Sequence, residues 1–191
     1  MERAENWRVD KCFVCSKGAQ KEWMVEGVPF FRSSDVVSAH KGAVNSKAYI
    51  SFVLYKELTR LSGKLEKNDI LITGGGSIGI PYIVPNDDPL YSKDADLIWI
   101  KGSSEFVSQY LFAYFVSQEF RDYIESISHV GTIAHYTIEQ VKETPARLPS
   151  MQEQKSIANY FQRLDALITL QQHKLEKLQN VKKSMLEKMF M

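Results

Sequence analysis

Residues 150–191 read SMQEQKSIANYFQRLDALITLQQHKLEKLQNVKKSMLEKMFM and contain neither glycine nor proline. Ser150 with Glu153 three residues later matches a capping box, and Leu148-Pro149 closes the segment before it. Apolar residues then recur at alternating spacings of three and four, which is the seam of a coiled coil. Polar residues interrupt this seam at Gln171 and Lys182. The seam residues are Ile157, Phe161, Leu164, Ile168, Leu175, Leu178, Met185 and Met189.

One helix over residues 150–191 reaches about 60 Å. A helix of that length with one apolar stripe needs a second long helix to cover it, and the rest of the chain offers none. The pattern therefore favours a partner helix in another chain. The alternative is a C-terminal helix that packs on its own domain.

The length of 191 residues fits one globular domain over residues 1–149 followed by this helix. The net charge is +1 with 25% charged residues, so a nucleic-acid role must rest on a local basic face. The start, MERAENWRV, lacks the apolar core of a secretion signal, and no apolar run approaches the roughly 18 residues of a membrane span. Two cysteines fit a reducing compartment, so the expected location is the cytoplasm, without membrane attachment.

The domain mixes short apolar runs with helical patterns, which predicts an α+β fold: a compact mixed sheet and helix domain followed by one long coiled-coil helix. Strands are expected at residues 11–16, 28–31, 70–73, 80–85 and 97–100. Residues 49–61 begin as a strand and turn into a short helix, residues 103–128 are helical with an aromatic stripe typical of a core, and residues 137–141 form a short helical turn.

Cys12 and Cys15 form a Cys-x-x-Cys pair. A zinc site needs two more ligands at suitable spacing, and the four histidines are scattered. A redox pair would begin a helix of a thioredoxin-like unit, which does not follow here. Buried structural cysteines are the favoured interpretation, and no metal site is predicted.

Residues 27–37 (GVPFFRSSDVV) bring together Arg32, Ser33, Ser34 and Asp35 after a strand-like run. An arginine and two hydroxyls at a strand end suit contacts to phosphates or base edges. The same residues also allow Arg32 to pair with Asp35, with Ser34 or Asp35 capping a short turn. Both interpretations stand on the residues alone.

Residues 74–79 (GGGSIG) literally match G-x-G-x-x-G after a strand. A dinucleotide site needs a helix at the last glycine, but Ile80-Pro81-Tyr82-Ile83 is strand-like, and the Gly-Lys-Ser/Thr of a phosphate loop is absent. What remains is a flexible glycine turn that permits close backbone approach to a ligand such as DNA, or else a plain hairpin connection.

Catalytic patterns are missing. The chain lacks the Asn/Asp-Pro-Pro-aromatic loop and the S-adenosylmethionine pocket of a base methyltransferase. Glu153-Gln154-Lys155 imitates a nuclease Glu-x-Lys, but it lies in the first turn of the long helix rather than on a strand beside an aspartate. No nucleophile and base stand together. We therefore predict no catalytic residues.

The order of the segments resembles the specificity subunit of type I restriction–modification enzymes over nearly the whole chain. The most specific match is residues 148–158, because family members commonly carry Leu-Pro-x-x-x-Glu-Gln-x-x-Ile at this place. Further matches are residues 27–36 (GVPFFRSSDV), 68–79 (NDILITGGGSIG) and Gly131-Thr132. The usual subunit has two recognition domains and two spacer helices that pair antiparallel, whereas this chain has one of each. It is thus like half a subunit: a natural half-length form, a truncated product or an excised fragment. It also lacks the family's Leu-Gly-Asp after Trp7.

This resemblance implies a non-catalytic subunit in which residues 1–149 read one half of a split double-stranded DNA target through the major groove. The helix would act as a spacer of at most about 18 base pairs, pair with a second copy, and dock the modification (methyltransferase) subunit. S-adenosylmethionine and ATP are expected on the modification and restriction subunits, with no cofactor on this chain. The expected DNA contacts lie in loops or at strand ends: Arg32, Ser33, Ser34, Thr73, Gly75, Gly76, Ser77, Lys93, Thr132, His135 and Tyr136.

Two rival interpretations remain. One is a recognition domain cut from a single-chain restriction–methylation enzyme. The other is a coiled-coil assembly module with no DNA role.

Overall fold

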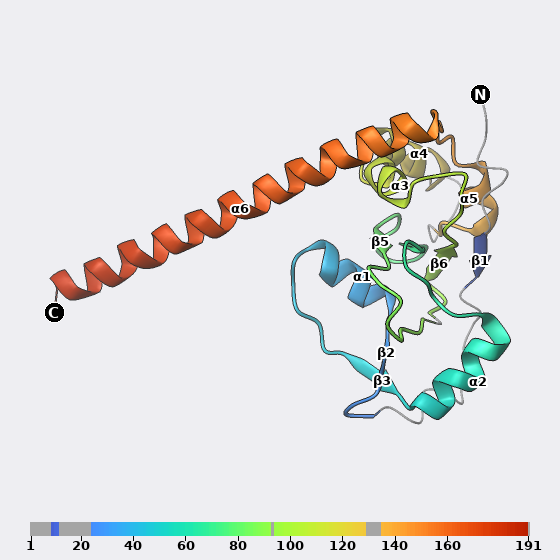
Figure 1. Cartoon of the computed structure of the whole chain (residues 1–191), viewed down its shortest axis with the longest axis horizontal. Helices are drawn as coiled ribbons and strands as arrows, with labels where there is room; N and C mark the ends of the chain where they lie inside the picture. Colours follow the sequence, from blue (N-terminus) through green and yellow to red (C-terminus); the bar gives the residue numbers. More distant parts are fainter. Residues whose placement is uncertain (1–8, 12–23, 93, 129–134, 191) are drawn as a thin grey trace.

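A computed structural model of the chain describes residues 9–11, 24–92, 94–128 and 135–190 (Figure 1). It confirms the predicted α+β class, with a mixed domain followed by one long helix. The elements, in chain order, are β1 Val9–Lys11, β2 Val28–Phe30, α1 Ser33–His40, β3 Ala48–Ile50, α2 Phe52–Ser62, β4 Ile70–Thr73, β5 Pro81–Ile83, β6 Leu97–Ile100, α3 Ser108–Phe115, α4 Gln118–Ser128, α5 Ile138–Glu143 and α6 Met151–Met189.

The main sheet is antiparallel throughout, with strand order β1-β6-β4-β5. Its central strands β4 and β6 are buried on both faces, and side chains alternate between the faces along each strand. Ile70, Ile72, Ile98 and Ile100 join the cluster formed with α3, α4 and α5. On the other face, Leu71, Leu97 and Trp99 pack with Val36 of α1, Leu65 and Val84. The sheet is therefore the middle layer of the domain.

The second sheet pairs β2 with β3 antiparallel, and its inner residues Val28, Phe30 and Ile50 form a separate core with Tyr91. Leu54, Tyr55 and Leu58 of α2 pack partly against this core. Figure 1 shows α2 and this small sheet at the end of the domain away from α6.

Two expectations need correction, and a third lies mostly outside the described residues. Lys11 belongs to β1 Val9–Lys11, whereas residues 12–16 of the strand expected at 11–16, including Cys12 and Cys15, lie outside the described residues. The turn expected after Arg32 is the helix α1. The single helix expected over 103–128 is two helices. They part at Val116-Ser117, and Phe115 and Phe120 on either side of this break both enter the core with ring centroids 5.0 Å apart.

Asp69 fixes the polar turn that leads into β4. Its buried carboxylate accepts hydrogen bonds from the Trp99 indole (2.8 Å), the Gly102 N–H (2.8 Å) and the Glu66 N–H (2.9 Å). Charge-assisted hydrogen bonds of this kind compensate for burying a carboxylate. Asp69 therefore holds the start of β4 to the end of β6.

The predicted capping box at the start of α6 is confirmed, since the Ser150 hydroxyl accepts from the Glu153 N–H and the Glu153 carboxylate accepts from the Ser150 N–H at 3.2 Å. Behind this cap, Gln154 is buried. Its Oε1 accepts from the N–H of Val107, the N-cap of α3, at 2.9 Å, and its Nε2 donates to the Pro149 carbonyl at 2.9 Å. One side chain thus anchors α6 to α3 and to the preceding loop.

Beyond this anchor, α6 leaves the domain and projects freely (Figure 1). Gln154 and Ala158 are its only buried residues. The eight seam residues are 36% to 74% exposed in the single chain. The alternative of a helix packed along its own domain is therefore wrong beyond the first turns.

We expect Gln154→Leu to lower the free energy of unfolding by about 1–3 kcal/mol, because two polar backbone groups lose their partner in a buried place. Urea denaturation followed by circular dichroism measures this change. Gln152→Leu, at an exposed position in the same turn, is the matched control and should change stability by less than about 0.5 kcal/mol. Equal effects of the two substitutions would contradict the anchoring role.

Candidate nucleic-acid interface

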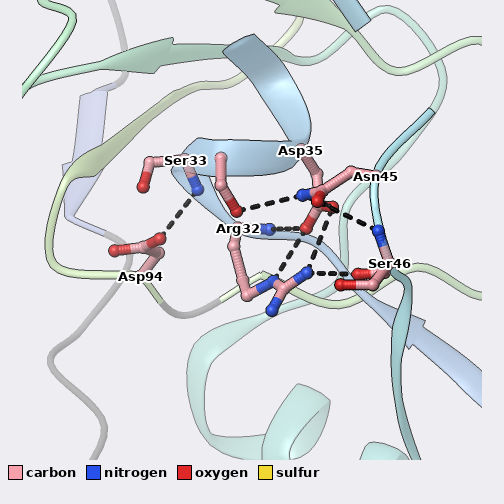
Figure 2. Close-up of polar contacts among 7 residues, drawn as sticks. Arg32, Ser33, Asp35, Asn45, Ser46 and Asp94 are labelled. Carbon is pink, nitrogen blue, oxygen red and sulfur yellow. Dashed lines mark hydrogen bonds and ion pairs between the residues drawn. The ribbon is translucent and has the colours of Figure 1, made fainter. Parts of the chain in front are cut away.

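Hydrogen bonds and an ion pair around Arg32 and Asp35 stabilise the first turn of α1 (Figure 2). Arg32 Nε lies 3.0 Å from Asp35 Oδ2, and its Nη2 donates to Asp35 Oδ1 and to the Ser46 carbonyl. Asn45 Nδ2 donates to Asp35 Oδ1 at 2.7 Å and to the Ser34 hydroxyl at 3.2 Å. The interpretation in which Arg32 pairs with Asp35 is thus confirmed. The Arg32 side chain nevertheless remains 31% exposed, and no described residue accepts from its Nη1.

The same helix start is tied to the glycine turn through residues 94–96. Asp94 Oδ2 accepts from the Ser33 N–H at 2.7 Å (Figure 2), and its Oδ1 accepts from the Asp96 N–H at 3.0 Å. The Asp96 carbonyl in turn accepts from the Gly74 N–H at 2.7 Å. Three hydrogen bonds therefore link the first turn of α1 to the glycine turn, and we call the loops that they join the continuous edge.

His135 and Tyr136 join this edge from the other side, since the Gly74 carbonyl accepts from the Tyr136 N–H at 2.8 Å. Segments that are more than 60 residues apart in the sequence, from Ser33 to Tyr136, are thereby connected through Gly74. The structure brings together the described segments that the sequence selected separately.

The glycine turn is the hairpin connection between β4 and β5, as one of the two interpretations held. The Thr73 hydroxyl donates to the Ser77 carbonyl and accepts from the Ile80 N–H at 2.9 Å. Gly76 has φ +64°, a conformation that favours glycine. At Gly75 a Cβ would lie 2.3 Å from Asp96 Oδ1, so a side chain there requires the Asp96 carboxylate to move. The strand β5, not a helix, follows the turn, as the strand-like residues 80–83 predicted.

The structure separates the predicted contact residues by exposure. Thr73, Gly75 and Tyr136 are buried, and the Tyr136 hydroxyl bonds to Thr144, while burial raises the pKa of the Tyr136 phenol. These three residues hold the loops and do not reach the surface of this structure. Lys93 and Thr132 lie outside the described residues. Exposed or partly exposed are Arg32, Ser33, Ser34, Gly76, Ser77 and His135.

A set of cations was missed in the sequence because it forms no linear motif. Residues 24–64 hold six basic and three acidic side chains, whereas residues 65–105 hold three basic and seven acidic ones. With Arg32 and Asp35 paired, the exposed basic residues of this segment lie in the loop after α1 and on or just after α2: Lys41, Lys47, Lys56, Arg60 and Lys64. We call these five the basic set. Counting charge by segment would have found it.

Other kinds of site are not indicated in the described part of the chain. No group of three or more histidine, cysteine, aspartate or glutamate side chains there could hold a metal ion. Among the described helices, none has the length and apolar character needed to cross a membrane.

Comparison with known proteins gives consistent matches. The family model described as "Type I restriction modification DNA specificity domain" matches residues 9–180. A putative type I restriction enzyme specificity subunit of Haemophilus influenzae is 26% identical over 121 residues, covering 63% of this chain and 30% of that protein.

Solved structures of similar fold include the HsdS subunit from Thermoanaerobacter tengcongensis, with a TM-score of 0.59 and 15% identity over 88% of this chain and 37% of that one. The type I restriction–modification S subunit from M. genitalium gives a TM-score of 0.51 and 18% identity over 86% of this chain and 38% of that one. At such identities the likeness concerns the fold. This chain spans about a third of the length of these relatives.

Proposed function

We propose, since this chain belongs to the type I restriction–modification DNA specificity family, that its domain recognises one half of a bipartite double-stranded DNA target. In this role the chain is non-catalytic. It positions a modification subunit, which supplies S-adenosylmethionine and flips the target base, and an ATP-driven restriction subunit. The family match over residues 9–180 is the observation that carries this proposal.

The charge distribution supports it. The chain as a whole is nearly neutral, yet residues 24–64 carry the five exposed cations of the basic set against the exposed carboxylates of Glu26 and Glu57. Contacts to phosphates supply most of the affinity of DNA-binding proteins, and polar groups at base edges supply specificity. We assign the phosphate contacts to the basic set and the base contacts to the exposed residues of the continuous edge, among them Ser34, Ser77 and His135.

The long helix supports the proposal that the DNA target is bipartite. Its seam is unpaired in the single chain, and 39 residues span about 58 Å. At 3.4 Å per base pair this corresponds to about 17 base pairs between two reading domains. Two copies that pair their helices antiparallel would present two domains at opposite ends and a central surface for the modification subunit.

The test is selection of duplexes from a random pool by this chain mixed with the modification subunit of the same system, followed by titration at increasing salt. We expect one enriched half-site, and an affinity that falls by about 10²–10³ between 50 and 200 mM salt. A complex that enriches no sequence and shows no salt dependence would instead support the coiled-coil module. Light scattering on the same mixture gives the number of copies of this chain in the complex.

Ser77→Ala is the sharpest single test of the continuous edge. The Ser77 side chain is exposed, while its carbonyl keeps the bond to Thr73, so the substitution leaves the hairpin intact. We expect a loss of about 1–3 kcal/mol of discrimination at one base pair, measured by competition between duplexes. Thr73→Val is the matched control, because it alters a buried hydroxyl of the same turn. It should lower stability and leave base preference unchanged. A Ser77→Ala chain with unaltered preference would remove Ser77 from the interface.

A further inference from the structure

We propose that two copies of this chain pair α6 in one particular antiparallel register, and that the last turn of each helix docks in a groove between α3 and α6 of the other copy. This inference rests on the self-association in the proposed function and specifies its geometry.

The groove lies where α6 leaves the domain and has a volume of about 430 Å³. Phe112 of α3 and its C-cap residue Val116 form one wall, and Ala158 and Phe161 of α6 form the other. Phe161 is also a seam residue and is 46% exposed. The apolar seam of α6 therefore continues into the groove without interruption, and a helix that follows the seam arrives there.

The polar interruptions of the seam select the register. If Gln171 lies opposite Lys182 of the second copy, both interruptions fall in the same layers, and the lysine ammonium can donate to the glutamine Oε1. The layers between and beside them then hold only apolar pairs, namely Leu175 with Leu178, Ile168 with Met185, and Leu164 with Met189.

Neighbouring registers bury polar groups without partners. A shift of one heptad in one direction places Lys182 opposite Leu164 and Gln171 opposite Leu175. A shift of one heptad in the other direction places Lys182 opposite Leu178 and Gln171 opposite Met189. A shift of two heptads in the first direction places Lys182 opposite Ile157 and Gln171 opposite Ile168. A lysine or a glutamine amide enclosed by leucine and isoleucine loses hydration without gaining a hydrogen bond. The register with Gln171 opposite Lys182 avoids this at every layer.

In this register the two helices lie side by side from Leu164 to Met189. This overlap begins just after Ala158 and Phe161, which form one wall of the groove. The second copy's helix then ends at the groove. Met189 and Phe190 are 74% and 83% exposed, the highest values among the large apolar residues of this segment, and they are the residues delivered there. The groove supplies the contact that the single chain lacks for them.

Charge agrees with the antiparallel direction. Residues 171–190 contain five lysines and two glutamates, and a parallel pair would place these two basic halves side by side. In the proposed register Lys177 lies at the level of Glu176 of the second copy, and Lys188 lies at the level of Asp165, which lines the groove. The helix dipoles also oppose each other favourably.

Paired cysteines test the register in the full chain. Oxidised Gln171→Cys, Lys182→Cys chains should form dimers linked between positions 171 and 182, identified by mass spectrometry of the cross-linked peptides so that the native cysteines can stay. Gln171→Cys, Leu175→Cys chains are the control and should not link 171 to 175. A dimer that links 171 to 175 overturns the register and leaves self-association and DNA recognition standing. A chain that is monomeric at all concentrations overturns the self-association as well.

Phe190→Asp tests the groove. We expect it to weaken the dimer about tenfold to a hundredfold in sedimentation equilibrium, because each copy loses one buried phenylalanine contact. Phe52→Asp is the matched control, since Phe52 is also mostly exposed but lies on α2, and it should leave the dimer unchanged. An unweakened Phe190→Asp dimer would show that the groove stays empty. DNA binding of the domain, measured on the same variants, reports separately on the recognition role.

Discussion

A chain with Leu175→Asp and Leu178→Asp is expected to be monomeric where the unaltered chain is dimeric. Leu175 of one helix lies opposite Leu178 of the other in the proposed register, so the double substitution places four carboxylates at adjacent layers of one interface. Charges removed from water without partners are costly, and the dissociation constant should rise by at least about 10³-fold. Light scattering over a range of concentrations measures this.

The control for this prediction carries the same added charge on the opposite side of the helix. The substitutions His173→Asp and Asn180→Asp lie away from the seam, at exposed positions, and should leave the dimer intact. Circular dichroism should show equal helix content in both variants. Dimers of the Leu175→Asp, Leu178→Asp chain would mean that the seam has been assigned to the wrong face.

The second large effect is expected when the basic set is replaced by glutamine. Lys41, Lys47, Lys56, Arg60 and Lys64 are assigned to phosphates, and each contact that is lost lowers the slope of log affinity against log salt by about one. Affinity at 50 mM salt should fall about a hundredfold or more, with the enriched sequence unchanged, in fluorescence anisotropy titrations.

The matched control replaces exposed cations elsewhere on the domain: Lys67, Arg121, Lys142 and Arg147. Their replacement by glutamine should weaken binding by less than about tenfold, through the general loss of positive charge. If this control weakens binding as much as the basic set does, the DNA lies on another face of the domain.

The elements that could be predicted are those whose signal is local. The seam and the Ser150–Glu153 cap define α6, and continuous apolar runs define β4 and β6, because a strand buried on both faces has no polar side. The helix α1 could not be predicted in this way. Its sequence, SSDVVSAH, contains serines, an aspartate and β-branched valines that favour helices weakly. It is stabilised by distant groups, namely Asp94, Asn45 and the sheet face on which Val36 is buried.

The same distinction holds for the candidate interface. The loops that the sequence selected separately are linked in the structure, since hydrogen bonds connect the segments of Ser33, Gly74 and Tyr136. The sequence alone could not show which polar side chains reach the surface. A threonine or tyrosine gives the same sequence pattern whether its hydroxyl bonds to solvent or to its own turn. Thr73 and Tyr136 bond inside the domain, and Ser77 does not bury its side chain.

In the proposed function, the two hydrogen bonds of Gln154 would affect how accurately distance along DNA is measured. They set the direction in which α6 leaves the domain, and α6 is a lever about 58 Å long. A tilt of about 5° at its root displaces its far end by about 5 Å, which exceeds the 3.4 Å rise of one base pair. The angular stiffness of this one buried amide therefore limits how exactly the spacing between two half-sites is read. A recognition domain exchanged at Pro149 keeps that accuracy only if it offers Gln154 a backbone N–H where Val107 now does.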